Sequence, residues 1–344
     1  MSNASQLADL RRLIDAEAPF VTVSIPTPSE LDDAQHRFEI EWRNARRELE
    51  ATDWDADDLS ELDALVATLP HDGGVSLVVM RAADGTTIAE FLDEPIREMV
   101  VVESVLPRLA LIIEARQRAL SHLVVEADRA GADLRAFDGG RVSETDQVEG
   151  DTEHIHRGAP GGWSQRRFQQ RAENTWERNA DEVAAQIVEV SKHHQPEMIF
   201  IAGDVRAQQM VLESLPERER DMTSLIEAGS PEGIADEVAR MLSDHAARGV
   251  RDLVERLRQR VGTGTASTDV ADILACLAEG RVEHLLVHDD GTEDPVTTES
   301  HGATPAGARV VDAAIAAAIR TDADVTVVPR VAALDGPIAA LYRW

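Results

Sequence analysis

The feature that most constrains the fold is a long, unbroken helical pattern in the middle of the chain. From Gln165 to about His193, apolar residues recur at spacings of three and four. This periodicity predicts a single amphipathic helix about 40 Å long, with one face buried against other elements. The apolar positions are Phe168, Ala172, Trp176, Ala180, Val183, Ile187 and Val190.

The segments around this helix predict a sheet for it to cover. Residues 122–137 read as a β-hairpin with a turn at Asp128 to Gly131, and the polar stretch 142–153 reads as a strand or loop. After the helix, residues 197–203 form an apolar strand that ends in Gly203 and Asp204 before another helix. Hairpin, long helix, strand and helix follow one another as in a layered α/β domain.

The flanking regions predict two further α/β units. Ahead of the hairpin we expect helices near residues 5–16 and 31–51 and strands near 20–24, 74–81 and 86–92. A helical pattern over 234–261 ends in a glycine- and threonine-rich stretch, after which helices and strands alternate as in a small α/β/α sandwich. The fold class is therefore α/β (α+β, multidomain), with three domains at 1–118, 119–262 and 263–344.

The most distinctive local sequence is the glycine-rich, arginine-bearing stretch that leads into the long helix. Residues 154–178 contain five arginines and two glutamates, a local charge of +3 in a chain whose net charge is -30. Pro160, Gly161 and Gly162 favour a loop, and Ser164 is a candidate N-cap. A positive island on so acidic a protein indicates contact with a phosphate backbone.

Composition excludes several classes of protein. No apolar run approaches the ~20 residues of a membrane-spanning helix, and the start of the chain lacks a basic segment followed by an apolar one, so we expect a cytoplasmic protein without a membrane partner. The single cysteine, Cys276, excludes an internal disulfide and sits in an apolar context typical of a core position.

Four segments together resemble the bacterial branch of the archaeo-eukaryotic class-1 release factor superfamily, in particular the Balon-like ribosome hibernation factors. Gly161-Gly162-Trp163-Ser164-Gln165 stands where that family has its Gly-Gly-Gln loop. Residues 198–204 resemble the next strand of the middle domain, and residues 280–287 and 334–343 resemble the C-terminal domain. The resemblance implies a ribonuclease-H-like middle domain that contains the long helix, and an L7Ae-like C-terminal domain.

The departures from the family limit what the resemblance implies. Trp163 and Ser164 separate Gly162 from Gln165, and a shift of this size puts hydrolysis of peptidyl-tRNA in doubt, because misplacement by ~1 Å can cost large factors in rate. The only lysine is Lys192, so the Asn-Ile-Lys-Ser motif of stop-codon decoding is missing from the N-terminal domain.

The leading hypothesis is a release-factor-like factor that occupies the ribosomal A site in hibernation or stress without decoding a stop codon. Its implied partners are the ribosome, through rRNA and the P-site tRNA, and elongation factor Tu; no cofactor is implied. Trp163 either stacks on a base or folds back under the loop, and both readings stay open. The expected RNA-binding residues are Arg157, Gly161, Gly162, Trp163, Ser164, Gln165, Arg166, Arg167 and Arg171.

The sequence also allows two other functions. One is a peptidyl-tRNA hydrolase that rescues stalled ribosomes, with Gln165 orienting the attacking water. The other is an acidic stress protein that never meets the ribosome, which the net charge favours. For the arginine island itself, the alternative is a solvated helix start whose arginines neutralise neighbouring acids.

A metal or nuclease site has little support in the sequence. We expect no metal, because the histidines lack zinc-like spacing and read as surface or RNA-facing residues, and because the three aspartates sit at turns where local hydrogen bonds favour aspartate. The residues concerned are His154, His156, His193 and His194, and Asp128, Asp138 and Asp204.

Overall fold

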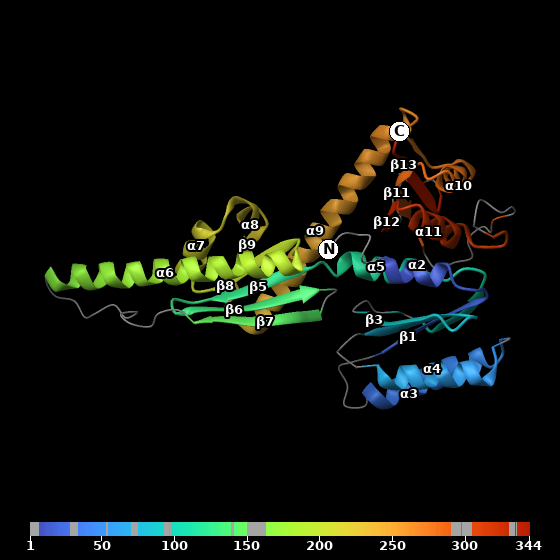
Figure 1. Ribbon diagram of the computed structural model, residues 1–344, viewed down its shortest axis with the longest axis horizontal. Helices are drawn as coiled ribbons and strands as arrows, with labels where there is room; N and C mark the ends of the chain where they lie inside the picture. Colours follow the sequence, from blue (N-terminus) through green and yellow to red (C-terminus); the bar gives the residue numbers. More distant parts are fainter. Residues whose placement is uncertain are drawn as a thin grey trace. The chain divides into compact units, whose positions relative to one another are not determined.

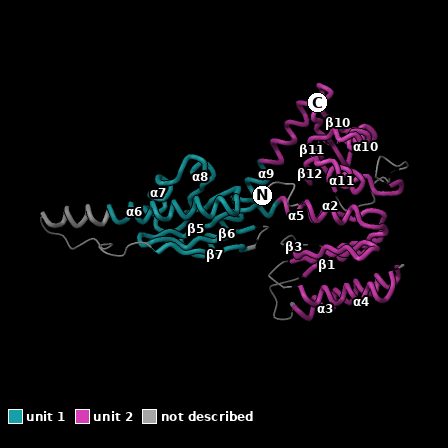
Figure 2. The backbone as a smooth tube through the Cα atoms, in the orientation of Figure 1, with its two compact units in different colours: residues 1, 118–248 teal, residues 2–117, 249–344 magenta. Residues whose placement is uncertain are grey.

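The computed structural model describes residues 7–27, 34–52, 54–69, 75–92, 96, 98–138, 141–149, 163–289, 297, 305–329, 334 and 336–344, and for residues 163–173 it describes the backbone. The chain is mixed α/β with three sheets, as predicted (Figure 1). It packs into two compact units: residues 118–248 form one, and residues 2–117 form the other together with residues 249–344 (Figure 2). Within the described ranges, no helix is both long and apolar enough to cross a membrane.

The first sheet is antiparallel, with the strand order β3-β2-β1-β4. Helices cover both of its faces (Figure 1). Phe38, Ala45 and Leu49, in the helix expected near residues 31–51, are buried against one face, so this helix covers the sheet on one side. The strands are β1 (Phe20–Pro26), β2 (Ser76–Ala82), β3 (Thr87–Leu92) and β4 (Val100–Ser104), and the helices are α3 (Ala34–Leu49) and α4 (Ala56–Thr68) on that face and α2 (Ala8–Ile14) and α5 (Ala110–Arg118) on the other.

The middle unit contains the five-stranded sheet, in the order β7-β6-β5-β8-β9. Strands β5, β6 and β7 are antiparallel, whereas β8 and β9 run parallel to β5. The predicted long helix is confirmed as α6 (Trp163–His194), which packs with α7 (Val205–Ser214) on one face. The strands are β5 (His122–Ala127), β6 (Gly131–Asp138), β7 (Arg141–Glu149), β8 (Met198–Gly203) and β9 (Thr223–Leu225), and α8 (Glu217–Asp221) precedes β9.

Helix α9 (Pro231–Val261) is shared by the two units. Its first part, with Ile234 and Val238, covers the second face of the middle sheet. Its last part, with Leu253 and Leu257, covers one face of the third sheet. One outer layer of the predicted C-terminal sandwich is therefore a helix that precedes residue 263.

The third sheet has the order β10-β13-β11-β12, with β11 and β12 parallel. Helices α10 and α11 cover the face opposite α9, and Cys276 is buried in α10, as predicted. The strands are β10 (Ala266–Ser267), β11 (Val282–Val287), β12 (Asp324–Val327) and β13 (Ile338–Tyr342), and the helices are α10 (Val270–Ala278) and α11 (Val310–Arg320).

The first and third sheets are joined through one hydrophobic core. Leu10, Leu13 and Ile112 belong to the same buried cluster as Ile315 of α11. At the edge strand β12, Gln117 Nε2 donates to the Val327 carbonyl oxygen at 2.6 Å and Gln117 Oε1 accepts from the Val327 amide at 2.9 Å. The side-chain amide of Gln117 thus pairs with this edge as a further strand would.

His122 makes the stability of the middle unit depend on pH. Burial lowers the pKa of His122 below its ordinary value of 6.5, although its hydrogen bond to the Leu120 carbonyl opposes the shift. Below pH 6.5 the unfolded chain therefore binds a proton at His122 that the folded chain does not bind. The free energy of unfolding is highest above pH 6.5 and declines as the pH falls toward the lower pKa of the folded state.

Replacing His122 by phenylalanine removes this titration and preserves the stack on Phe137, whose ring centroid lies 4.5 Å away. We expect the wild type to lose more of its free energy of unfolding between pH 7.5 and pH 5.0 than His122→Phe does, as measured by urea denaturation. A variant that loses as much stability as the wild type would contradict this assignment.

Candidate nucleic-acid interface

Six of the nine predicted interface residues lie in the first turns of α6. Arg157, Gly161 and Gly162 fall outside the described residues, as do His154 and His156. Helix α6 begins at Trp163, so Ser164 lies in its first turn and is not the N-cap, which corrects that prediction. Trp163, Ser164, Gln165, Arg166, Arg167 and Arg171 all have helical backbone.

The charge at this end of α6 is of one sign. The first turn contains no acidic residue, and Arg166, Arg167 and Arg171 follow within the first three turns. The unpaired N–H groups of a helix start carry about half a positive elementary charge. The helix start therefore favours an anion here, such as a nucleic-acid phosphate, and the sequence adds three arginines to it.

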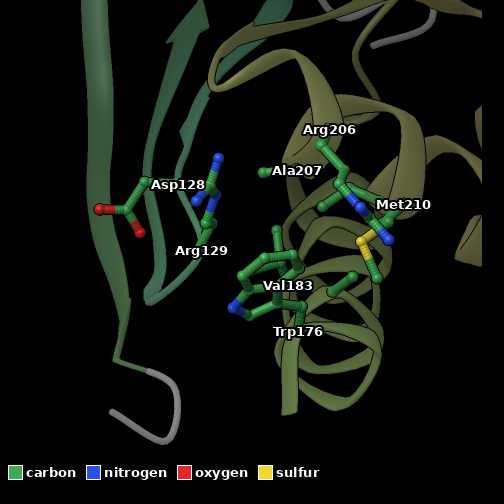
Figure 3. A pocket seen from close by; sticks show the side chains of 9 residues that line it. Asp128, Arg129, Trp176, Val183, Arg206, Ala207 and Met210 are labelled. Atoms are coloured by element: carbon green, nitrogen blue, oxygen red, sulfur yellow. The ribbon is translucent and has the colours of Figure 1, made fainter. Parts of the chain in front are cut away.

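Further along the same helix, two arginines cover one tryptophan. Trp176 is buried on α6, and the guanidinium carbon atoms of Arg129 and Arg206 lie 4.8 Å and 5.2 Å from its ring centroid (Figure 3). Arg129 belongs to the turn after β5, and Arg206 is the second residue of α7. Both contacts have the geometry of a cation–π interaction, which holds the two guanidinium groups at fixed positions.

Asp204 holds this cluster together at the ends of the parallel strands β5 and β8. It caps α7 by accepting from the amides of Arg206 and Ala207 at 3.0 and 3.1 Å, and it accepts from Arg129 Nη2 at 3.0 Å. Burial would raise the pKa of Asp204, but the Ala207 hydrogen bond and the charge of Arg129 outweigh this effect and lower the pKa. Asn179 Nδ2 anchors the backbone from the other side by donating to the Arg129 carbonyl at 2.9 Å.

The hollow at this cluster is too small for a metabolite. Its volume is about 10 Å³, which is room for one water molecule. Ligand pockets for small molecules are typically of several hundred Å³.

Two of the aspartates weighed as nuclease candidates serve local structure. Asp128 Oδ1 accepts from the amides of Ala130 and Gly131 within the β5–β6 turn, and Asp204 caps α7. The prediction of local hydrogen bonding is thus confirmed for these two residues. Among the described residues, no group of three potential metal ligands is found.

A β-bulge brings together one cluster that the sequence did not predict. The register between β6 and β7 shifts after Ala136, which leaves Ser143 as an extra residue. His194 at the end of α6 contacts Glu144 Oε2 through Nε2 at 2.6 Å and Ser143 Oγ through Nδ1 at 3.4 Å. These contacts tie the end of α6 to β7, while His193 Nδ1 lies 3.0 Å from the Glu189 carbonyl oxygen. No periodicity or motif in the sequence signals this contact, because the two segments lie 50 residues apart.

Comparison with known proteins finds similarity to one family model and to two mycobacterial proteins. Residues 121–263 match the model of bacterial archaeo-eukaryotic release factor family 2. Two uncharacterized proteins of Mycobacterium tuberculosis, Rv2629 of strain H37Rv and MT2704 of strain CDC 1551, are each 26% identical over 298 residues, which is 84% of this chain and 79% of theirs.

Solved structures of translation factors also align along the chain. The archaeal translation termination factor aRF1 is 17% identical, with coverage of 100% of this chain and 99% of that one and a TM-score of 0.27. A model of ribosome-bound archaeal Pelota and ABCE1 is 15% identical, with coverage of 99% and 94% and a TM-score of 0.46. Dom34 of S. cerevisiae is 11% identical, with coverage of 99% and 91% and a TM-score of 0.40.

Proposed function

We propose that the chain, whose residues 121–263 match the model of bacterial archaeo-eukaryotic release factor family 2, is a ribosome-associated translation factor that occupies the A site of idle ribosomes. The observation that carries the proposal is the family match, which covers the part of the chain with the arginine-bearing start of α6. Contacts from arginine to phosphate position a protein without reading sequence, which is what a factor that binds folded rRNA requires.

In this proposal the middle unit directs residues 161–171 toward the peptidyl-transferase centre, where Arg157, Arg166, Arg167 and Arg171 bind phosphates of rRNA or of the P-site tRNA. The N-terminal domain faces the decoding centre, and it does so without the lysine-containing motif that reads stop codons. Its 11 arginines against 24 acids give this domain little attraction for RNA, so the proposal assigns most of the electrostatic affinity to the local cluster of arginines at residues 157–178. Elongation factor Tu is the protein partner that this role implies.

Sedimentation with vacant 70S ribosomes tests the proposal. We expect the wild type to pellet through a sucrose cushion and Arg166→Glu/Arg167→Glu to stay in the supernatant at the same salt concentration. Loss of two phosphate contacts also lowers the slope of log Kd against log salt concentration by about two. The matched control is Arg218→Glu/Arg240→Glu, which makes the same charge change at two exposed arginines of the middle unit and should pellet like the wild type.

Equal loss of binding in the control would mean that net charge alone governs the association. Failure of the wild type to pellet would contradict the proposal and favour an acidic stress protein that does not meet the ribosome.

A peptide-release assay separates the proposed factor from a peptidyl-tRNA hydrolase. Gln165 is the third residue of α6, so the helix fixes its backbone. We expect no release of peptide from ribosomes loaded with peptidyl-tRNA, at protein concentrations that saturate ribosome binding. Release that Gln165→Ala abolishes while binding persists would overturn this expectation and establish the hydrolase.

A further inference from the structure

Three side chains tie one turn of α6 to two other elements of the unit formed by residues 118–248 (Figure 3). They belong to Arg129, Trp176 and Asp204, and we call them the Trp176 clamp. The guanidinium carbon atom of Arg129 lies 4.8 Å from the centroid of the Trp176 ring, and Arg129 Nη2 donates to Asp204 Oδ2 at 3.0 Å. Asn179, three residues after Trp176, donates to the Arg129 carbonyl oxygen at 2.9 Å. Arg129 therefore contacts the same turn of α6 at two points.

The clamp is anchored on main chain that is itself hydrogen-bonded. The Asp128 amide donates to the Gly131 carbonyl oxygen at 2.9 Å, and Asp128 Oδ1 accepts from the Gly131 amide at 2.9 Å, which closes the turn that contains Arg129. The Asp204 amide donates to the Ala127 carbonyl oxygen at 3.0 Å, which joins the ends of β5 and β8. Both anchors of the clamp thus have fixed backbone positions.

The part of α6 that precedes the clamp has little helical stability of its own. From Trp163 to Asn174 it is twelve residues long, about 18 Å of helix. Isolated helices shorter than about 12–15 residues are marginal in water. The first turn contains no acidic residue, and Arg166, Arg167 and Arg171 place positive charge toward the positive end of the helix dipole. The charges that favour a phosphate therefore oppose the helix on which they occur.

A helix extends at little cost once one of its turns has formed. Nucleation has an equilibrium factor of about 10⁻³, whereas each further residue multiplies the population by a factor of about 1. The clamp fixes the turn from Trp176 to Asn179, and burial in α6 begins beside it: Asn174 is exposed, whereas Thr175 and Trp176 are 4% and 3% exposed. Residues 163–174 therefore extend from a turn that tertiary contacts have already formed.

We infer that Arg129, Trp176 and Asp204 are positioning residues for the ribosome contact of α6. They hold the turn from which residues 163–174 continue as helix. A segment that is helical in the free protein loses less conformational freedom when it binds, so the clamp raises affinity without touching RNA. The effect on ribosome binding rests on the proposed function, whereas the effect on the helix is measured without ribosomes.

Asp204→Asn tests the clamp in the free, full-length protein. Asparagine has one side-chain oxygen in place of the two that cap α7 and accept from Arg129, so one of these contacts is lost. We expect the ¹³Cα chemical shifts of residues 163–174 to lose about a third or more of their helical displacement in NMR spectra, because the helix population falls.

Asp221→Asn is the matched control for this spectrum. It makes the same charge change at an exposed residue of the same unit, and it should leave the shifts of residues 163–174 unchanged. Unchanged shifts in Asp204→Asn, or an equal loss in both variants, would overturn the inference.

Ribosome binding separates a positioning role from a simple effect of charge. Removing a carboxylate raises the affinity for a phosphate backbone when charge alone matters. We expect instead that Asp204→Asn weakens binding to vacant 70S ribosomes about fivefold or more, because ordering the helix start then opposes binding. The slope of log Kd against log salt concentration should equal that of the wild type, since the phosphate contacts of the bound state are the same. Unchanged or tighter binding, or a changed slope, would overturn the positioning role.

Trp176→Leu repeats both measurements without a change of charge. Leucine is apolar and a better helix former than tryptophan, but it offers no ring to Arg129, so the helical shifts and the affinity should both fall. Ile187→Ala is its control, because Ile187 is fully buried on the same helix eleven residues later. This control should lower the free energy of unfolding and leave the shifts of residues 163–174 and the Kd of the folded protein unchanged.

The two measurements fail independently of each other. If the wild type does not bind ribosomes while the shifts respond as expected, the proposed function is wrong and the clamp still governs the helix. If the wild type binds ribosomes and the shifts do not respond, the proposed function stands and the positioning role is wrong.

Discussion

Replacing Gly203 by alanine will destabilise the middle unit by about 3 kcal/mol or more. Gly203 is the last residue of β8 and has a φ of +108°, a conformation that residues with a side chain rarely adopt. A β-carbon at this position would lie 2.1 Å from the carbonyl oxygen of Ala127, the residue opposite it on the parallel strand β5. That oxygen accepts the amide of Asp204 at 3.0 Å, so the main chain must move for the alanine to fit.

The exposed residue Gly229, in the same unit, provides the matched control. A β-carbon there meets nothing within 4 Å, so Gly229→Ala is expected to raise the free energy of unfolding by about 0.4–1 kcal/mol. Urea denaturation monitored by the indole NMR signal of Trp176 follows the middle unit, because this residue is buried beside the same turn. Equal stability of Gly203→Ala and the wild type would show that the strand ends separate without cost.

Replacing Arg309 by methionine will lower the free energy of unfolding by about 3–5 kcal/mol, because two carboxylates lose their shared cation. Arg309 Nη2 lies 2.8 Å from Asp289 Oδ1, and Nη1 lies 3.4 Å from Asp312 Oδ2. The side chains of Arg309 and Asp312 are only 10% and 2% exposed, so water cannot replace the lost charge.

Arg256→Met is the control for this effect. Arg256 also lies 2.8 Å from a carboxylate, that of Glu283, but both side chains are well exposed and Arg260 contacts the same acid. An exposed pair contributes about 0–1 kcal/mol, so this variant should unfold at nearly the wild-type urea concentration. A similar loss of free energy of unfolding in both variants would show that burial does not determine the cost of removing the cation.

Periodicity in the sequence predicted the elements whose apolar faces are long. The stripe from Phe168 to Val190 gave α6 to within two residues, and Trp176 is buried as that pattern requires. Helix α4 was not predicted, although Leu59, Leu62 and Val66 follow helical spacing and Asp55 caps its start. Strand β9 has only three residues, too few for any periodicity to show.

Contacts between distant segments could not be read from the sequence. The stack of Arg129 and Arg206 on Trp176 joins three elements, and nothing local to any of them requires the other two. The core shared by the first and third sheets did have a signal, because every residue from Val310 to Ile319 except Asp312 is apolar, and all of them are buried. A helix of that kind must be covered on every face, and α2 supplies cover that the C-terminal segment lacks.

The division of the chain into units also sets an order for its synthesis. The middle unit is one continuous stretch, residues 118–248, whereas the other unit needs residues from both ends of the chain. Since Leu10 and Leu13 share their core with α11, this core cannot close until residue 320 has left the ribosome. Domains fold as they emerge, so we expect the middle unit to fold first, while the side of α2 that packs on α11 lacks its partner for about 300 residues of further translation. The core that contains α2 is therefore completed after the middle unit, although α2 is made before it.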